Sequence, residues 1–360
     1  MSVIFLNSHR AKSGLVNGKK LPEDYIMAAK FFDCGIIDRT ETLEVGFDQR
    51  VLDPIPAFDP SFTLSFAEIC QQVGAELVAE AKRTKQTIQL LWSGGIDSTV
   101  ALIALLKNMD PDELAGRIEV FASMKSINEY PFFFRHFILG KLPYRIIAPP
   151  ITQHFSERGL IVTGEHGDQL FGSDKLLPLI ANGLAYESYE DILPIYLVDK
   201  FGNHPKNDRL LRYLQPLIQA CPTEVKTTFD LFWWLNYTIK WQQVSLRLPI
   251  FTFRPEVSEL ASRFRHFFRD PRFEQWSFHQ HERRAATSLT TYKQAAKDYI
   301  LDFTGDSAYW QQKSKEPSLQ HVIINRKKQG NQRYRVLMED NYQPIVEVFH
   351  KQFKNKNISE

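Results

Sequence analysis

Residues 87–98 read TIQLLWSGGIDS, and this stretch decides both the fold and the ligand that the chain is expected to bind. The apolar run at 87–92 is typical of a buried strand, and the run at 98–106 is typical of a helix. A glycine pair between a strand and a helix lets backbone N–H groups converge on an anion, and the helix N-terminus adds a favourable dipole. The two serines supply hydroxyl donors, whereas Asp97 would repel a bare phosphate. The pattern therefore predicts a site for a magnesium-bound polyphosphate.

Other interpretations of this loop explain less of it. A P-loop requires a lysine after its last glycine, and none follows Gly95. The run SGLVNGKK at 13–20 has the wrong glycine spacing, and a dinucleotide-binding loop requires a third glycine. A tight turn with a Ser or Asp helix cap accounts for one polar residue, but not for an ordered set of small and polar residues.

A second glycine-bracketed motif, TGEHGDQLFG, occupies residues 163–172. Between the motifs, strand-like runs at 118–122, 144–148 and 160–163 alternate with helix-like segments near 129–139 and 151–157. This alternation predicts a parallel sheet with helices on both faces, in which ligands bind at the carboxyl ends of the strands. Both motifs begin at such ends, so we expect them to face one site.

Together the two motifs indicate a family. Residues 93–98 resemble the pyrophosphate-binding loop of the ATP pyrophosphatase superfamily, whose members cleave ATP between the α- and β-phosphates. Residues 163–172 are similar to the matching segment of the asparagine synthetase group, which also contains β-lactam synthetases and lasso-peptide cyclases. The resemblance extends over residues 60–320. It implies a Rossmann-like α/β domain of the adenine nucleotide alpha hydrolase type, with a mostly helical C-terminal region.

The motifs supply candidate ligands for Mg²⁺ and ATP. Magnesium takes oxygen ligands and bridges phosphate oxygens to one or two carboxylates. Asp97 and Asp168, each beside glycines at a strand end, are the expected pair, and the resemblance implies the same assignment. The residues that we assign to nucleotide binding are Leu91, Trp92, Ser93, Gly94, Gly95, Asp97, Ser98, Met124, Thr163 and Gly164.

Glu165 is the candidate base. In the synthetases the matching Glu is assigned to the step in which an amine attacks an acyl-adenylate, where a carboxylate can accept the proton that nitrogen loses. His166 departs from the family pattern, because members mostly carry a small residue there. Two roles stay open for His166: narrowing the substrate pocket, or sharing in proton transfer near neutral pH.

The chemistry also needs a cation, since preorganised positive charge in a dry site is often the largest catalytic effect. The segments YKQAAKDYI at 292–300 and WQQK at 310–313 resemble the synthetase region that holds the catalytic Lys and a downstream Trp-Arg-Gln-Lys. By order and helical context Lys297 matches that lysine, with Lys293 as its competitor one turn earlier, and Lys313 is assigned to pyrophosphate. The alternative is that these lysines lie on the exposed face of a helix.

Composition excludes several classes of protein. The chain is 43% hydrophobic and 24% charged, which allows a normal core, and its net charge of +2 gives no argument for nucleic acid or an acidic membrane. Its three cysteines are widely spaced and form no metal-binding pattern, so we expect free thiols. We see no signal peptide and no apolar run near the ~20 residues that a membrane span requires. We expect a cytoplasmic protein without membrane partners.

The chain divides into four parts in this interpretation. A short segment at 1–60 ends in the proline-punctuated stretch 53–60, which we interpret as a linker or extended arm. The ATP pyrophosphatase domain follows at 61–185, the helical part of the synthetase domain at 186–325, and a basic, solvated tail at 326–360. The segment before the loop is too short for the glutaminase domain of glutamine-using synthetases. Nitrogen is therefore expected from free ammonia, a separate glutaminase or an amine substrate.

The leading hypothesis is an ATP-dependent amide ligase. A substrate carboxylate would attack the α-phosphate, pyrophosphate would leave, and ammonia or an amine would then displace AMP. A second hypothesis keeps the ATP chemistry but activates a nucleobase for nitrogen or sulfur insertion; the absence of a catalytic Cys pair and of a strong basic face disfavours it. A third is a nucleotide-binding regulator without catalysis, which would not need Asp97, Asp168 and Glu165 together.

Overall fold

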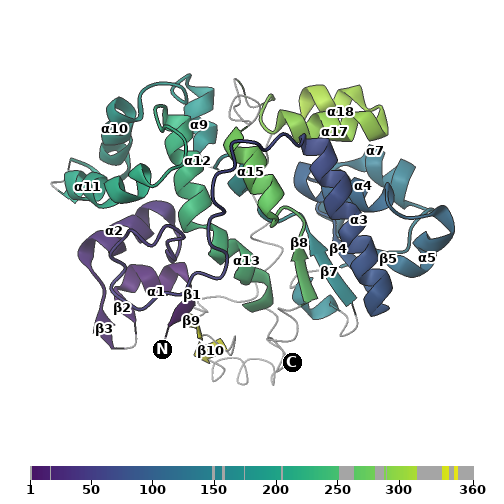
Figure 1. The fold of residues 1–360 in the computed structure, drawn as a ribbon, viewed down its shortest axis with the longest axis horizontal. Coiled ribbons are helices and arrows are strands. Elements are labelled where there is room, and N and C mark those ends of the chain that lie inside the picture. The colour runs from purple at the N-terminus through teal and green to yellow at the C-terminus, as the bar shows by residue number, and fades with distance from the viewer. Residues whose placement is uncertain are drawn as a thin grey trace, which may run out of the picture.

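The two motifs lie at one end of an all-parallel β-sheet (Figure 1). The computed structural model describes residues 2–16, 18–147, 151–155, 159–173, 175–203, 206–250, 263–279, 288, 290–313, 335–339 and 344–347. Within these residues the strand order is β6-β5-β4-β7-β8, and each neighbouring pair is parallel. The strands are β4 (Thr87–Leu91), β5 (Ile118–Ala122), β6 (Tyr144–Ile146), β7 (Gly159–Thr163) and β8 (Phe264–His266). The α/β, Rossmann-like prediction is therefore confirmed.

The sheet is buried on both faces, which explains why its strands are continuously apolar. Val120 on β5 belongs to the large core, whereas its neighbour Phe121 packs in a smaller cluster on the other face with Ile161 of β7. The first face is covered by α3 (Phe66–Thr84) and α4 (Ile96–Leu106), which pack on each other. The second cluster includes Leu248 from a helix far along the chain.

The connections within the α/β region are short. They comprise η1 (Pro111–Glu113), α5 (Leu114–Arg117), α6 (Met124–Glu129), α7 (Pro131–Phe133), the π-helical turn η2 (Phe134–Ile138), η3 (Ile151–His154) and α8 (Gly167–Phe171). The sequence predicted strands β4 to β7 close to these bounds. It did not predict β8, which comes from a stretch that we expected to be helical. A three-residue strand at the edge of a sheet carries too little periodicity to be recognised alone.

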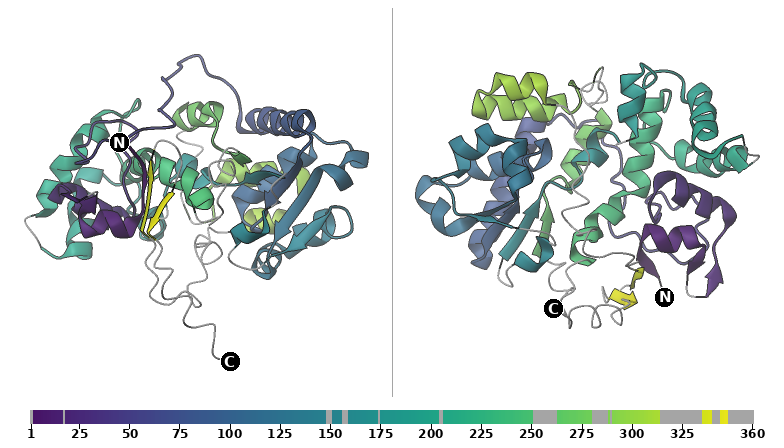
Figure 2. Two further views of the ribbon diagram at one scale, coloured as in Figure 1. Left: turned by 90° about the horizontal axis from the view of Figure 1, so that it is seen from below. Right: turned by 180° about the vertical axis from the view of Figure 1, so that it is seen from behind.

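The helical region lies beside the sheet (Figures 1 and 2). It contains α9 (Leu176–Ala181), α10 (Tyr189–Phe201), α11 (Lys206–Gln219), α12 (Thr228–Ile239), α13 (Trp241–Ile250), α15 (Pro271–His279), α17 (Gln294–Thr304) and α18 (Ser307–Gln312). Every residue of α12 is buried, so this helix is part of the packed core. Helix α15 contacts α3 and α8, and α17 contacts α4, so the helical region is fastened to the sheet next to both motifs.

The N-terminal segment is folded. It forms β1 (Val3–Leu6), α1 (Ser8–Ser13), β2 (Leu15–Val16), β3 (Lys19–Lys20) and α2 (Glu23–Phe32), and α2 packs on α11. The expected tail at 326–360 contributes β9 (Arg335–Glu339) and β10 (Pro344–Glu347), and β9 pairs antiparallel with β1. These two strands are not predicted by the sequence, because it does not reveal that β1 is available for pairing. The rest of that tail lies outside the described residues.

A buried ion pair joins the N-terminal segment to α15. Arg39 Nη2 lies 2.6 Å from Glu274 Oε2, and the guanidinium stacks 4.3 Å from the centre of the Trp241 ring. Arg39 also donates hydrogen bonds to the carbonyls of Asp53 and Pro54. The stretch 53–60 is thus an extended arm held by side-chain contacts, as one of the two sequence interpretations proposed.

Replacing Arg39 with Ala should destabilise the protein by about 3–5 kcal/mol, because a carboxylate would be left buried without its partner. Burial already raises the pKa of Glu274 against the opposing effect of Arg39. Urea unfolding followed by tryptophan fluorescence measures the change. Lys226→Ala, which removes the exposed pair with Glu224, is the control and should leave the midpoint unchanged. Equal midpoints for the two variants would contradict the assigned role.

Candidate active site

Both motifs emerge at the switch point of the sheet. From β4 the chain proceeds to β5 and β6 on one side and returns to β7 on the other side of β4. Leu91 and Thr163, the last residues of β4 and β7, are register partners. The loops that follow these strands are therefore neighbours. This is the position at which open parallel sheets bind ligands.

The first loop is held in shape by its own hydroxyl groups. The Ser98 hydroxyl accepts a 3.0 Å hydrogen bond from the Ser93 N–H and lies 2.9 Å from the Ser93 hydroxyl. Gly94 has a φ of 77°, and a Cβ there would overlap the Ser126 carbonyl, so glycine is required on both counts. Helix α4 starts directly after Gly95, so the N–H groups of its first turn lie beside the loop. The backbone is arranged to receive an anion.

The second loop packs tightly against the first. A Cβ on Gly167 would overlap the Asp97 carboxylate, so this glycine is needed for the two motifs to meet. The preceding residue, His166, has a φ of 75°, an uncommon conformation for a residue with a side chain. The turn aims Asp168, in the first turn of α8, toward Asp97.

Lys293 lies between the two aspartates. Its Nζ is 2.5 Å from Asp97 Oδ2 and 2.7 Å from Asp168 Oδ1, and its side chain is only 4% exposed. Lys293 is the N-cap residue of α17 and has a φ of 59°. Burial opposes its charge, but the two carboxylates outweigh burial and raise the pKa of Lys293 overall. Three segments far apart in sequence thus converge on one ammonium group.

The same carboxylates fit the ligand set of a magnesium ion. Both are hard oxygen donors, and because both contact Lys293 Nζ, they are close enough to each other to share one ion. Among the described residues no group of three or more His, Cys, Asp or Glu could hold a metal by itself. Magnesium typically takes one or two protein carboxylates and completes its shell with phosphate oxygens and water.

Glu165 forms an ion pair with Arg247 of α13. Burial raises the pKa of Glu165; Arg247 lowers it, and the nearby Asp168 and Asp97 raise it further, so the net direction is upward. A carboxyl group with a raised pKa is a stronger proton acceptor once ionised. The sequence does not point to Arg247, because nothing in the local pattern of α13 relates it to Glu165, eighty-two residues earlier.

His166 is enclosed rather than facing a pocket. It is 1% exposed, its ring lies 4.2 Å from that of Trp241, and its Nε2 is 3.0 Å from the Ser245 hydroxyl. Burial lowers the pKa of His166 well below its usual value, and the neighbouring His266 and arginines add to this. His166 is therefore a neutral, packed imidazole at neutral pH.

Of the other two predicted lysines, Lys313 lies near the first loop and Lys297 contacts Lys313. Lys313 Nζ lies 2.9 Å from Glu129 Oε1, and a Cβ on Gly95 would lie 3.2 Å from the same oxygen. Lys297 is 1% exposed, and its Nζ donates to the Thr290 carbonyl and lies 3.4 Å from the Lys313 carbonyl. Burial lowers the pKa of Lys297. Lys297 thus connects Thr290, before α17, to Lys313, after α18. Lys293, in contrast, contacts the carboxylates of the two aspartates.

The remaining predicted nucleotide contacts differ in where their side chains lie: two point into the interior, and the others lie at or near the loops. Trp92 is buried, and its indole N–H donates to Thr99, so only its backbone faces the loop. The Thr163 hydroxyl is 2.7 Å from His266 Nδ1 and faces the interior. Met124, the first residue of α6, is 62% exposed. It lies two residues before Ser126, whose carbonyl packs against Gly94. Gly164 packs against the backbone of Asp97 and Ser98, and Leu91 is partly buried.

No family model, no curated protein and no solved structure matches this chain. Within the parts of the chain that the structure describes, no helix is both long and apolar enough to cross a bilayer.

Proposed function

We propose that this protein is an ATP-dependent ligase that adenylylates a substrate carboxylate and transfers the acyl group to ammonia or an amine, as asparagine synthetase-like enzymes do. One observation carries the proposal. Asp97, Asp168 and Lys293 meet at the carboxyl ends of β4 and β7, directly beside a loop arranged for an anion. Two carboxylates and a buried ammonium next to such a loop match the charges of a magnesium-bound triphosphate and its reacting α-phosphate.

Binding is assigned to the first loop and the two aspartates. The backbone N–H groups at 93–98 and the N-terminus of α4 would receive phosphate oxygens. Asp97 and Asp168 would hold Mg²⁺, which neutralises phosphate charge when it is bound. Lys313, beside Glu129, would neutralise the departing pyrophosphate.

The catalytic cation in this proposal is Lys293 rather than Lys297. A substrate carboxylate oxygen attacks the α-phosphorus, and the bond to the β-phosphate oxygen breaks. Negative charge then develops on the α-phosphate oxygens, and an ammonium held in place before the reaction stabilises it without reorganisation. Lys293 is buried in contact with both aspartates, whereas Lys297 donates to backbone carbonyls.

Glu165 is assigned to the second half-reaction. The amine nitrogen attacks the acyl carbon, AMP leaves, and the nitrogen must lose a proton. Glu165 accepts that proton, and Arg247 keeps its carboxylate ionised before the transfer. Glu165 directly follows the loop residue Gly164, so the base and the phosphate-binding loop share one rim of the sheet.

A pyrophosphate-release screen tests the proposal. The purified protein with ATP and Mg²⁺ should release pyrophosphate only when a suitable acid is added, and AMP and an amide should form when an amine or ammonia is added as well. Amino acids, small amines and ammonia are the first compounds to test, with Asp97→Ala as the blank. ATP binding without pyrophosphate release from any acid would favour the regulator hypothesis, and release that depends on a nucleic-acid base would favour the nucleobase hypothesis.

A further inference from the structure

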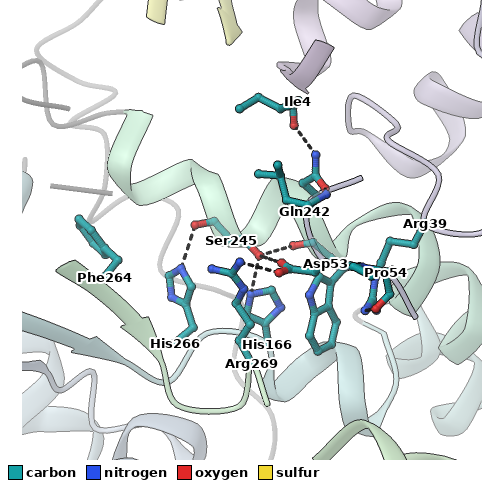
Figure 3. A network of polar contacts seen from close by, with 12 residues as sticks. Ile4, Arg39, Asp53, Pro54, His166, Gln242, Ser245, Phe264, His266 and Arg269 are labelled. Carbon is teal, nitrogen blue, oxygen red and sulfur yellow. Dashed lines mark hydrogen bonds and ion pairs between the residues drawn. The ribbon is translucent and has the colours of Figure 1, made fainter. Parts of the chain in front are cut away.

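A buried polar network runs from the Glu165 N–H to Ser245 of α13, two residues before Arg247. Figure 3 shows the part of it formed by His266, Ser245 and His166. His266, the last residue of β8, lies between the end of β7 and helix α13. Its Nδ1 is 2.7 Å from the Thr163 hydroxyl, and its Nε2 is 2.8 Å from the Ser245 carbonyl. The Thr163 hydroxyl in turn accepts a hydrogen bond of 3.2 Å from the Glu165 N–H.

The direction of each hydrogen bond follows from its acceptors. A carbonyl can only accept, so His266 Nε2 carries the proton and donates a hydrogen bond to the Ser245 carbonyl. Burial lowers the pKa of His266 to about 3, so at neutral pH its Nδ1 has no proton and accepts a hydrogen bond from the Thr163 hydroxyl. Thr163 then has a lone pair available for the Glu165 N–H. The chain of hydrogen bonds therefore has one self-consistent polarity.

This chain begins and ends beside the Glu165–Arg247 ion pair. At one end it holds the backbone of Glu165; at the other it holds the carbonyl of Ser245, two residues before Arg247 on α13. The Ser245 hydroxyl adds a second link, 3.0 Å from His166 Nε2, which fixes the residue between Glu165 and Gly167. Thus the His266 imidazole connects the end of β7, two residues before Glu165, to α13, which carries Arg247.

We propose that His266 and Thr163 are positioning residues, which hold Glu165 and Arg247 in register for proton transfer from the attacking amine. This inference rests on the proposed function and goes beyond it, since it assigns a part in the second half-reaction to His266, which lies outside both motifs. Displacing a reacting group by 1 Å can cost about 100-fold in rate. Phosphate binding and adenylylation depend instead on the first loop, Lys293 and the aspartates.

The test compares the two half-reactions in matched variants. Thr163→Val keeps the shape but removes the hydroxyl, and should lower kcat for amide formation by up to about 100-fold. Acid-dependent exchange between ATP and labelled pyrophosphate should change far less, because the Thr163 hydroxyl contacts His266 and the Glu165 N–H and not the first loop, so its predicted contact with the nucleotide is not made by the side chain. Thr163→Ser, which keeps the hydroxyl, should restore most of the loss. His266→Leu should lower kcat for amide formation as Thr163→Val does. In His266→Asn the amide oxygen can replace Nδ1 as acceptor, so its kcat should lie between those of the wild type and His266→Leu.

Thr238→Val controls for stability. Thr238 is a fully buried threonine of α12, and its hydroxyl donates to the Trp234 carbonyl, far from the loops in sequence. The Thr238→Val variant should lower the melting temperature about as much as Thr163→Val does. It should not lower amide formation more than pyrophosphate exchange. Equal losses in both half-reactions for Thr163→Val and His266→Leu would overturn the inference and indicate a purely structural role.

A measurement without turnover separates this inference from the proposed function. Hydrogen exchange of the Arg247 guanidinium, followed by NMR on arginine-labelled protein and assigned with Arg247→Lys, reports on the ion pair directly. Exchange should accelerate in Thr163→Val and return toward the wild-type rate in Thr163→Ser. Unchanged exchange in Thr163→Val would refute the positioning role even if the ligase activity is real. Accelerated exchange would support the role even if the substrate assignment proves wrong.

Discussion

Lys293→Met is expected to lower ATP-dependent turnover by about 10²–10³-fold or more, because it removes a preorganised positive charge from the reacting phosphate. The same substitution at Lys297 should have a smaller effect, since Lys297 contacts backbone carbonyls and supports Lys313 indirectly. Initial rates of acid-dependent pyrophosphate release, measured for both variants, compare the two residues directly.

Lys293→Met leaves the two carboxylates facing each other, so its folding must be checked. Mutual repulsion would destabilise the site, and Mg²⁺ should then raise the melting temperature of Lys293→Met more than that of the wild type. Circular dichroism with and without Mg²⁺ measures this difference. If folded Lys293→Met keeps near-wild-type rates while Lys297→Met loses them, the catalytic role belongs to Lys297.

Glu165→Gln should separate the two half-reactions. Its amide oxygen can still accept a hydrogen bond from Arg247, so the fold around α13 should be preserved. The amide cannot take a proton from the attacking amine, and removal of a general base typically costs 10²–10⁴-fold. Exchange of labelled pyrophosphate into ATP should continue, whereas amide formation, measured by mass spectrometry, should fall by about that factor.

Arg247→Lys is the matched control for Glu165→Gln. It keeps a positive charge near Glu165 but loses the planar fork of the guanidinium, so we expect a partial loss of amide formation only. If Glu165→Gln instead abolishes pyrophosphate exchange, Glu165 acts on the phosphate or metal side, and its assignment as the base is wrong.

Much of the site could be predicted because its parts are local. The run at 87–98 contains a strand, a turn that requires glycine and a helix start, and each depends mainly on neighbours in the chain. The second motif is equally compact, and parallel-sheet topology alone brings its loop beside the first. The prediction that Asp97 and Asp168 approach each other follows from these two local patterns, and both contact Lys293.

The choice between Lys293 and Lys297 could not be made from the sequence. The two residues are four positions apart, near the start of the same helix. Order and helical context favoured Lys297, but Lys293 occupies the N-cap with a left-handed backbone, and this turn directs its side chain to the aspartates. Cap geometry depends on how α17 packs against α4, which is a tertiary contact.

By itself, then, the sequence determined the class of fold, the glycine-requiring loop between β4 and α4, and the pair of aspartates, because hydrophobic periodicity and glycine requirements act over a few residues. Only the tertiary structure decided which ammonium lies between those aspartates, that Arg247 pairs with Glu165, and that β8 completes the sheet. It also decided that His266, on β8, connects the end of β7 to α13. These features join residues far apart in the chain, and no local pattern encodes a contact whose partner is set by packing.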